Sequence, residues 1–322
     1  MPVSDSSTLS IGMQIFYARM LLKRLLPLLI HTQFGQKGRI PRGMGKVMRW
    51  LRLGALAINK TPLTEGSPPA GKALTTAYVD LTMKQFGDFV TLTDVVKTQT
   101  FDPLLGDLMP VMAEQEGGSI DAYTCDVLNA GSNVQYAGGV ANRVSVAAAN
   151  KYSADEGLKA KRTLENANVL RIEGYYYAYA HPNTLYDLRK DSRWLNANQY
   201  VNNTNLKNGE EGELDGIRYL RSTATGKFTG AGASGIDVYS TLIFGQNWYT
   251  TASYDAEESG GTDPEMDGNA TELPVELILK ELGSAGTSDP LNQISTLAWK
   301  VAYETIISNQ FCGVRVEHSV SP

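Results

Sequence analysis

Apolar and polar residues alternate in two segments of the chain, strictly in the first of them. The first segment is residues 75–84, and the second is residues 296–307 near the C-terminus. In the first, the apolar side chains fall on one face: Ala77, Val79, Leu81 and Met83. Alternation with a period of two is typical of a half-buried strand, so both segments are predicted to be strands, with a helix as the alternative at 296–307. A last strand is expected from Phe311 to about Glu317.

A helical spacing of apolar residues predicts one long helix over residues 102–130. The Asp102–Pro103 pair supplies an N-cap and a first helical residue, and Gly131 supplies a C-terminal stop. The apolar positions are Leu104, Leu108, Val111, Met112, Ile120, Val127 and Leu128. Pro110 and the Gly117–Gly118 pair are expected to kink or weaken this helix.

Shorter elements of both kinds follow in the middle of the chain. Ser153 and Glu156 have the spacing of a capping box, which predicts a second helix from Ser153 to about Asn168. Strands are expected in three further segments: 169–180, 217–221 and 236–250. The first of these is rich in tyrosine, which suits either a core or an interface. Helices and strands mix without a regular βαβ rhythm, and this favours an α+β fold.

Composition adds limits to this picture. With 322 residues, 42% of them hydrophobic, the chain is long enough for about two domains, and wholesale disorder is excluded. Cys125 and Cys312 are too few for a disulfide scaffold or a cysteine zinc site and favour a reducing compartment. Lys23 and Arg24 interrupt the apolar run at 20–30, so a short amphipathic helix is expected there instead of a targeting segment or membrane anchor.

Charge divides the chain into two unequal parts. Residues 1–60 contain ten basic residues and one acid, which gives this segment a charge of +9. The remaining residues carry a charge of −14, and the net charge is −5. A basic arm on an acidic body is able to bind nucleic acid, a membrane or an acidic neighbour, and identical copies could use it to bind one another. A solvated basic face is the alternative interpretation.

Two segments imitate known ligand-binding loops. Residues 66–72 have the spacing of a phosphate-binding loop, but Ala73 lacks the hydroxyl that holds magnesium, and an alternating strand follows where a helix is required. Residues 255–272 carry seven acids and start a calcium-loop spacing at Asp263, but Pro274 occupies the twelfth position. Both are interpreted as solvated loops, with a weak calcium site as the alternative for the acidic one.

Candidate catalytic residues are scarce. The three histidines are His31, His181 and His318, and His181 is followed by Pro182 after an apolar strand, which indicates a structural or turn role. The sequence contains no GxSxG, no HExxH and no carboxylate pair that spacing alone would support. No catalytic, cofactor-binding or metal-binding residue is therefore predicted, and no cofactor is expected.

Seven stretches, in order along most of the chain, form a set. They are HTQFGQKGRIPRGMGK (31–46), TPLTEG (61–66), QFGDFVTLTD (85–94), DVLNAG (126–131), HPNTLYDLRKD (181–191), GELDGIRYLRS (212–222) and GSAGTSDPLNQISTLAWK (283–300). Each alone is a weak signal. Together they resemble the major capsid proteins of tailed bacteriophages, in the group typified by coliphage N-four. The likeness extends from about residue 12 to residue 318.

The resemblance implies the Hong Kong 97 capsid fold, an α+β fold. It implies five parts in chain order: an N-terminal arm (1–35), an extended hairpin loop (36–74), a peripheral domain with a long spine helix (75–135), an axial domain (136–288) and a return to the peripheral domain (289–322). The arm and hairpin have little core of their own, so they are expected to become ordered on neighbouring subunits.

The implied function is that of a major capsid protein and not of an enzyme. Pentamers and hexamers of the chain would form an icosahedral head around double-stranded DNA, touched only non-specifically. The expected location is the virion, after assembly in the bacterial host cytoplasm, with decoration, portal and scaffolding proteins as further partners and no membrane. The alternatives are an encapsulin-like compartment shell, a soluble enzyme that uses one of the two loops, and a nucleic-acid binder that uses the basic arm.

Some shells of this fold join a hairpin lysine to an asparagine of a neighbour. The residues in suitable regions are Lys46, Lys60 and Lys72, with Asn292 and Asn309. Lysine and asparagine are common residue types, so their presence carries little information. We predict no cross-link; a ladder of covalent multimers on a denaturing gel of mature particles would contradict this.

Overall fold

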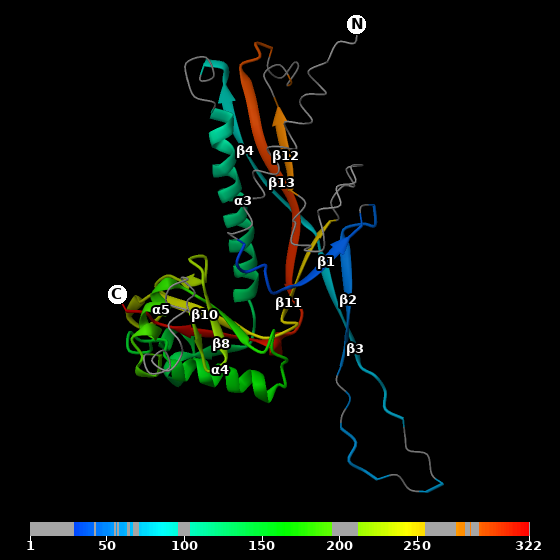
Figure 1. Ribbon diagram of the computed structural model, residues 1–322, viewed down its shortest axis with the longest axis vertical. Helices are drawn as coiled ribbons and strands as arrows, with labels where there is room; N and C mark the ends of the chain where they lie inside the picture. Colours follow the sequence, from blue (N-terminus) through cyan, green and yellow to red (C-terminus); the bar gives the residue numbers. More distant parts are fainter. Residues whose placement is uncertain are drawn as a thin grey trace.

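One long helix and three sheets divide the molecule into a compact lobe, an elongated half and a projecting hairpin (Figure 1). The computed structural model describes residues 29–41, 43–54, 56, 58–62, 65–66, 71–95, 104–194, 212–254, 275–280, 284 and 290–321. The compact lobe contains a seven-stranded sheet, the elongated half contains the long helix on a five-stranded sheet, and the hairpin is a two-stranded sheet.

The compact lobe is built around β10 (Val238–Phe244), whose seven residues are all buried. Its sheet has the order β5-β14-β10-β6-β8-β7, with β9 also paired to β10. The other strands are β5 (Val134–Tyr136), β6 (Tyr176–Ala180), β7 (Glu213–Leu214), β8 (Ile217–Arg221), β9 (Lys227–Phe228) and β14 (Gly313–His318). Two helices accompany the sheet: α4 (Ala154–Asn166), which contacts β14 and β10, and α5 (Pro182–Arg189).

Aromatic side chains fill the core of the compact lobe. Tyr176, Tyr177 and Tyr179 are at most 4% exposed, so the tyrosine-rich strand belongs to the core and not to an open surface. The ring of Phe244 lies 4.9 Å from that of Tyr179 and 5.1 Å from that of Trp248. Packed aromatic pairs add to the free energy of burial. The strand itself is shorter than the expected segment 169–180, because β6 begins only at Tyr176.

The elongated half is organised by β13 (Ile294–Ile307), which confirms the strand predicted at 296–307. One edge of β13 pairs with β4 (Lys84–Thr93), and the other pairs with β12 (Val275–Lys280) and β11 (Tyr249–Tyr254). The parallel strand β1 (Gln36–Ile40) completes the sheet beside β11. Alternate residues of β13 are buried against the long helix α3 (Leu104–Asn129), and these are Leu297, Trp299, Val301 and Tyr303.

The long helix is continuous, as its apolar spacing predicts. Pro110 lies inside α3, yet the helix passes through it, because buried Met109 and Met112 on either side hold this turn against the sheet. Pro110 and Gly117–Gly118 therefore do not interrupt the helix, and the kink or weakening expected at these positions stays a prediction. Val111 was expected on the apolar face but is 60% exposed, since the buried face follows Met109, Met112 and Ala113. No helix of the described residues is long and apolar enough to span a membrane.

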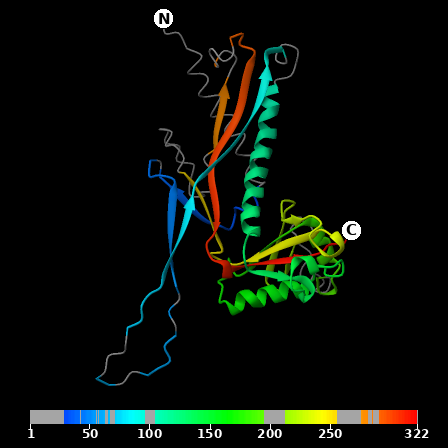
Figure 2. The same cartoon turned by 180° about the vertical axis from the view of Figure 1, so that it is seen from behind.

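The hairpin consists of β2 (Val47–Leu53) and β3 (Thr76–Thr82), which pair antiparallel with each other. The predicted alternation of β3 is confirmed at Val79, Leu81 and Met83, which are shielded, while Ala77 is exposed. The second strand of the hairpin, β3, lies outside the range 36–74 that the resemblance implied for the hairpin loop. Both views show β2 and β3 running away from the five-stranded sheet and the compact lobe (Figures 1 and 2).

The single strand expected at 236–250 is wrong. The segment forms β10 and β11, which belong to different sheets. A Cβ at Gly245 would lie 2.6 Å from the carbonyl oxygen of Leu170, and Asn247 has a φ of 64°. Such a left-handed backbone ends a strand and turns the chain from the compact lobe into the elongated half.

The capping box expected at the start of α4 is not formed. Ser153 is at the N-cap, but its side chain makes no capping hydrogen bond. The carboxylate of Asp191 instead accepts a hydrogen bond from the Ala154 backbone N–H at 3.0 Å. Glu156 is buried, where it accepts a hydrogen bond from the Gly138 backbone N–H and pairs with Lys159. The helix ends at Asn166, before the expected Asn168.

Candidate functional site

The hairpin carries a large apolar surface that the other described parts of the chain leave uncovered. Among its described residues, Ile58 is 84% exposed and Met44 is 75% exposed. The other exposed apolar side chains are Val47, Leu51, Leu53, Leu56, Leu74 and Tyr78. A two-stranded hairpin is marginally stable alone, and an exposed apolar patch of this kind marks an interaction surface. We call residues 44–82 with these side chains the hairpin surface.

The hairpin surface is also positively charged. Residues 44–82 contain five basic residues and two acids, Glu65 and Asp80. Arg49 binds the Asp80 carboxylate across the two strands with two hydrogen bonds of 2.6 and 2.7 Å, and its guanidinium lies over the Tyr78 ring. This hydrogen bonding lowers the pKa of Asp80 from its ordinary value. The pair is solvent-exposed, so it stabilises the subunit little and leaves the net positive charge in place.

Close packing fixes the root of the hairpin. Gly38 of β1 admits the hairpin because a Cβ there would lie 2.8 Å from Met48 Sδ and 3.0 Å from the Trp50 ring. Leu81 and Ile40 are buried together in a small cluster at the same place. The hairpin therefore leaves the elongated half at a set position, although its far end is uncovered.

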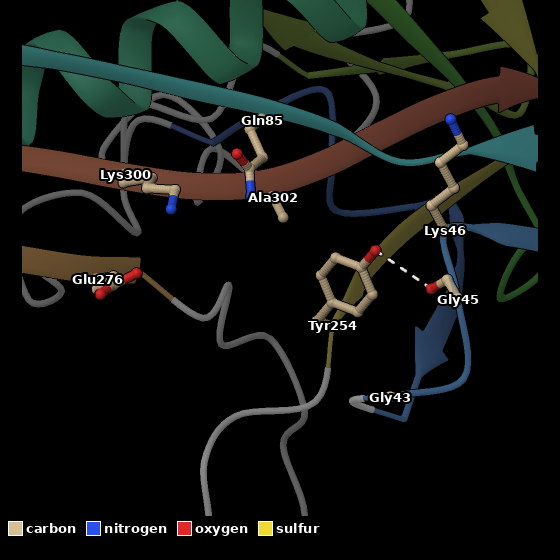
Figure 3. Close-up of a pocket in the computed structure, with 8 residues that line it drawn as sticks. All are labelled: Gly43, Gly45, Lys46, Gln85, Tyr254, Glu276, Lys300 and Ala302. Carbon is tan, nitrogen blue, oxygen red and sulfur yellow. Dashed lines mark hydrogen bonds between the residues drawn. The ribbon is translucent and has the colours of Figure 1, made fainter.

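A pocket of about 670 Å³ lies beside this root (Figure 3). Its described lining includes Lys300 and Glu276, which lie opposite each other in the register of β13 and β12. It also includes Tyr254, whose hydroxyl donates to the Gly45 carbonyl at 3.3 Å. Among the lining residues that the structure describes, there is no histidine or cysteine, and Glu276 is the carboxylate. These described side chains offer no pair of nucleophile and base for catalysis.

A buried pair of His31 and Asp121 attaches the first described residues of the chain to α3. His31 Nδ1 lies 2.7 Å from a carboxylate oxygen of Asp121, and the His31 backbone N–H donates to the other oxygen at 2.7 Å. Both residues are buried. Burial disfavours the imidazolium, but the hydrogen bond to Asp121 and the nearby Cys125 sulfur outweigh it and raise the pKa of His31 to about 9. This pair is structural, since no solvent reaches the His31 ring.

The exposed side of the long helix carries two acids, Glu114 and Asp126. In all, α3 contains five acids and no basic residue. Small residues lie between them on the same face, among them Gly118 and Ala122. In both views α3 and the hairpin lie on opposite sides of the molecule (Figures 1 and 2). One subunit therefore displays a basic apolar hairpin surface and, on α3, exposed acids.

The remaining sequence candidates that the structure describes do not form a common site. His181 is the N-cap of α5 and accepts a hydrogen bond from the Asn183 backbone N–H at 3.2 Å, and burial lowers its pKa. This agrees with the expected structural role. Of the phosphate-loop imitation, Gly66, Gly71 and Lys72 are described, whereas residues 67–70, the acidic segment 255–272 and the arm up to residue 28 lie outside the described residues. Within the described parts of the chain, no three His, Cys, Asp or Glu side chains form a metal site.

The two asparagines considered for cross-linking have different surroundings. Asn309 uses its side chain locally, because it accepts from the Phe311 backbone N–H and donates to Cys312 Sγ. It also lines a pocket of about 420 Å³ together with Trp50 and Arg52 at the hairpin root. Asn292 lies in an exposed turn with a φ of 53°. The absence of a cross-link stays a prediction.

Sequence reasoning recognised the charge of the hairpin but missed its apolar side chains as a surface. Leu51, Leu53, Leu56 and Ile58 lie in a stretch rich in Gly, Pro and basic residues. Apolar residues in a stretch of this composition were the signal that the sequence offered.

Solved structures of other proteins are similar to this chain. No protein-family model and no curated protein matches the chain. The capsid protein of Cyanophage P-SCSP1u has a TM-score of 0.67 and 13% identity, over 91% of this chain and 89% of that one. The capsid protein of Ralstonia phage GP4 has a TM-score of 0.67 and 13% identity, over 91% and 88%. The SrpI encapsulin of Synechococcus elongatus has a TM-score of 0.54 and 8% identity, over 94% and 90%. The chain therefore has the fold of phage capsid proteins.

Proposed function

We propose that this chain is the major capsid protein of a tailed phage, which assembles into the pentamers and hexamers of an icosahedral head around double-stranded DNA. The observation that carries the proposal is the hairpin surface, which is apolar, basic and uncovered, on a chain whose fold matches capsid proteins along almost its whole length. The proposal makes the protein a structural component and not an enzyme.

The finer assignment is the Hong Kong 97 arrangement. In it, α3 is the spine helix, the elongated half is the peripheral domain, the compact lobe is the axial domain and the hairpin is the extended loop. The continuous α3 on a long sheet, a separate compact lobe and a projecting hairpin support this assignment. The segment up to residue 35 is then the N-terminal arm.

Assembly follows from these two features of the subunit. The hairpin of one copy would cover its apolar side chains on the next copy, and its positive charge would favour the exposed acids of α3 there. Contacts of this head-to-tail kind close into rings when the rotation between copies permits it. Fully burying one leucine or isoleucine contributes about 1.5–3 kcal/mol, so several of them offset the entropy lost on association.

The other partners follow from the same role. Packaged DNA would be touched non-specifically by basic side chains, and the portal, decoration and scaffolding proteins would contact the assembled shell. The location is then the virion, after assembly in the bacterial host cytoplasm.

Electron microscopy and sedimentation of the purified full chain test this proposal. We expect closed shells or rings of five and six copies, and we expect a variant with residues 54–75 replaced by a short Asn-Gly turn to keep its circular dichroism spectrum but remain a monomer. A wild-type chain that stays monomeric even with its scaffold, or shells formed equally well by the shortened variant, would contradict the proposal.

An encapsulin-like compartment is the second candidate, because the SrpI encapsulin shares the fold at a TM-score of 0.54. The phage capsid proteins are more similar, at 0.67. The contents of particles purified from the native source separate the two functions. Nuclease-protected DNA of constant length identifies a phage head, whereas particles filled with a protein cargo identify a compartment.

A further inference from the structure

A buried carboxyl group lies on the packed face of α3. Glu116 is fully buried. Within the part of the chain that the structure describes, neither of its carboxyl oxygens has a hydrogen-bond partner. A buried carboxylate is normally paired or hydrogen-bonded, because the loss of its hydration costs several kcal/mol otherwise. Glu116 therefore requires a specific explanation.

Apolar side chains surround this position. The buried residues of the same packed face are Met112, Ala113 and Ile120 on α3, with Trp299 and Val301 on β13. The α3 residues are three or four positions from Glu116 and so share its side of the helix. The Trp299 indole donates to Gln115 Oε1 at 3.4 Å, which places β13 beside this turn of α3. Glu116 thus lies at the contact between the helix and the sheet.

The described charged groups of α3 and β13 do not pair with the carboxyl group of Glu116. On α3, Asp121 is bound by His31, and Glu114 is exposed. On β13, Lys300 lies on the face opposite to the buried Trp299 and Val301, since successive side chains of a strand alternate. Glu304 forms an ion pair with Lys84 at 2.9 Å.

The neighbouring strands supply no counter-charge either. On β4, the Asp88 carboxylate accepts a hydrogen bond from the Gln115 side chain. On β12, Leu277 and Leu279 pack against the apolar cluster, so Glu276 and Lys280 are directed to the other face. Among the described residues that pack here, none offers a cation to Glu116.

We propose that Glu116 is a proton-dependent latch, which holds α3 on the sheet while its carboxyl group carries a proton and loosens this contact when it ionises. Burial alone raises the pKa of Glu116 to about 8. The folded chain therefore keeps a proton that the unfolded chain, with an ordinary glutamate, releases above about pH 4.5. The stabilisation is complete below that pH and is lost progressively as the pH rises to about 8. This property belongs to the single subunit and does not depend on the proposed function.

Urea unfolding of the full chain at pH 5–8 tests the latch. In Glu116→Gln the side chain stays neutral at every pH. We expect the unfolding equilibrium constant of the wild type, divided by that of Glu116→Gln, to increase by up to about tenfold per pH unit. Glu165→Gln, at an exposed position of α4 in the compact lobe, should behave as the wild type. A ratio that does not change with pH would overturn the proposal.

Infrared spectroscopy gives a second readout on the folded wild-type protein. At pH 6.5 exposed carboxyl groups are ionised, so the carbonyl stretch of a protonated carboxyl group should remain from Glu116 and disappear in Glu116→Gln. If the glutamine variant does not fold, Glu116→Met, with an apolar chain of similar length, replaces it in both experiments. The same band in the wild type and the variant, or no band in the wild type, would contradict the latch.

Discussion

The compact lobe and the hairpin both contain seven-residue strands rich in apolar side chains, but they bury them differently. β10 has β14 along one side and β6 and β9 along the other, and all of its residues are buried. β2 pairs with β3, and none of its seven residues is buried. Neighbouring elements, and not apolar content, decide burial. Apolar side chains of β10 therefore stabilise the subunit, while those of the hairpin are available to stabilise contacts between subunits.

The largest effect is expected from the core of the compact lobe. Phe244→Ala removes a fully buried ring that packs on Tyr179 and Trp248. The apolar surface that is no longer buried and the cavity left behind should together reduce the free energy of unfolding by about 3–5 kcal/mol. Urea unfolding of the full chain measures this. Phe89→Ala, at a 64% exposed position of the elongated half, is the control and should change stability by less than about 0.5 kcal/mol.

The hairpin should give the opposite result. Leu53→Ser with Ile58→Ser replaces two side chains that are 57% and 84% exposed in the subunit. The urea midpoint should stay unchanged, whereas the protein concentration needed for assembly should rise by about a hundredfold or more, since each of the two apolar side chains contributes about 1.5–3 kcal/mol when buried between copies. Light scattering across a concentration series measures it. Assembly at the wild-type concentration would show that these side chains stay uncovered in the shell.

Acid should distinguish the compact lobe from the elongated half. His318 is fully buried, and burial lowers its pKa to about 4. Its neutral ring is held by Thr241 and the Ser319 carbonyl. The unfolded chain binds a proton below about pH 6.5 that the folded chain resists, so stability is lost as the pH falls from about 6.5 towards 4. The proposed latch at Glu116 has the opposite sign and gains stability over part of that range.

His318→Gln isolates this effect. Comparison of its urea midpoint with that of the wild type from pH 7 to pH 4.5 should show a wild-type loss of up to about tenfold in the folding equilibrium per pH unit, which the variant lacks. A parallel pH dependence in both proteins would show that His318 titrates normally in the folded chain.

Much of the fold follows from local pattern. The strand at 217–221, the strand at 296–307 and the long helix all have their predicted type, because their periodicity is long or their boundaries carry turn residues. The break at Gly245 and Asn247 was missed because a close carbonyl contact and a left-handed backbone are properties of the folded chain. α5 was missed because His181 is an unusual N-cap.

The candidate surface was less accessible to sequence reasoning. Charge asymmetry is visible in the sequence, and it drew attention to the N-terminal part of the chain. The exposure of Leu51 or Ile58 is not visible there, since it results from the absence of a covering element. The burial of Glu116 was missed for the reverse reason, because a glutamate on a helix is usually solvated.

The smallest effect is expected from the exposed charges of the hairpin. Arg49→Gln breaks the cross-strand pair with Asp80, but both groups are solvent-exposed, so the urea midpoint of the subunit should not change measurably. If the hairpin approaches an acidic neighbour, the variant should assemble severalfold more slowly at low ionic strength, and the difference should vanish near about 1 M salt, where the Debye length is about 3 Å. Arg162→Gln, on the exposed face of α4 in the compact lobe, removes the same charge as a control. Equal slowing by both variants would indicate that net charge, and not the position of the hairpin, governs encounter, and the contrast between the two regions would then rest on apolar burial alone.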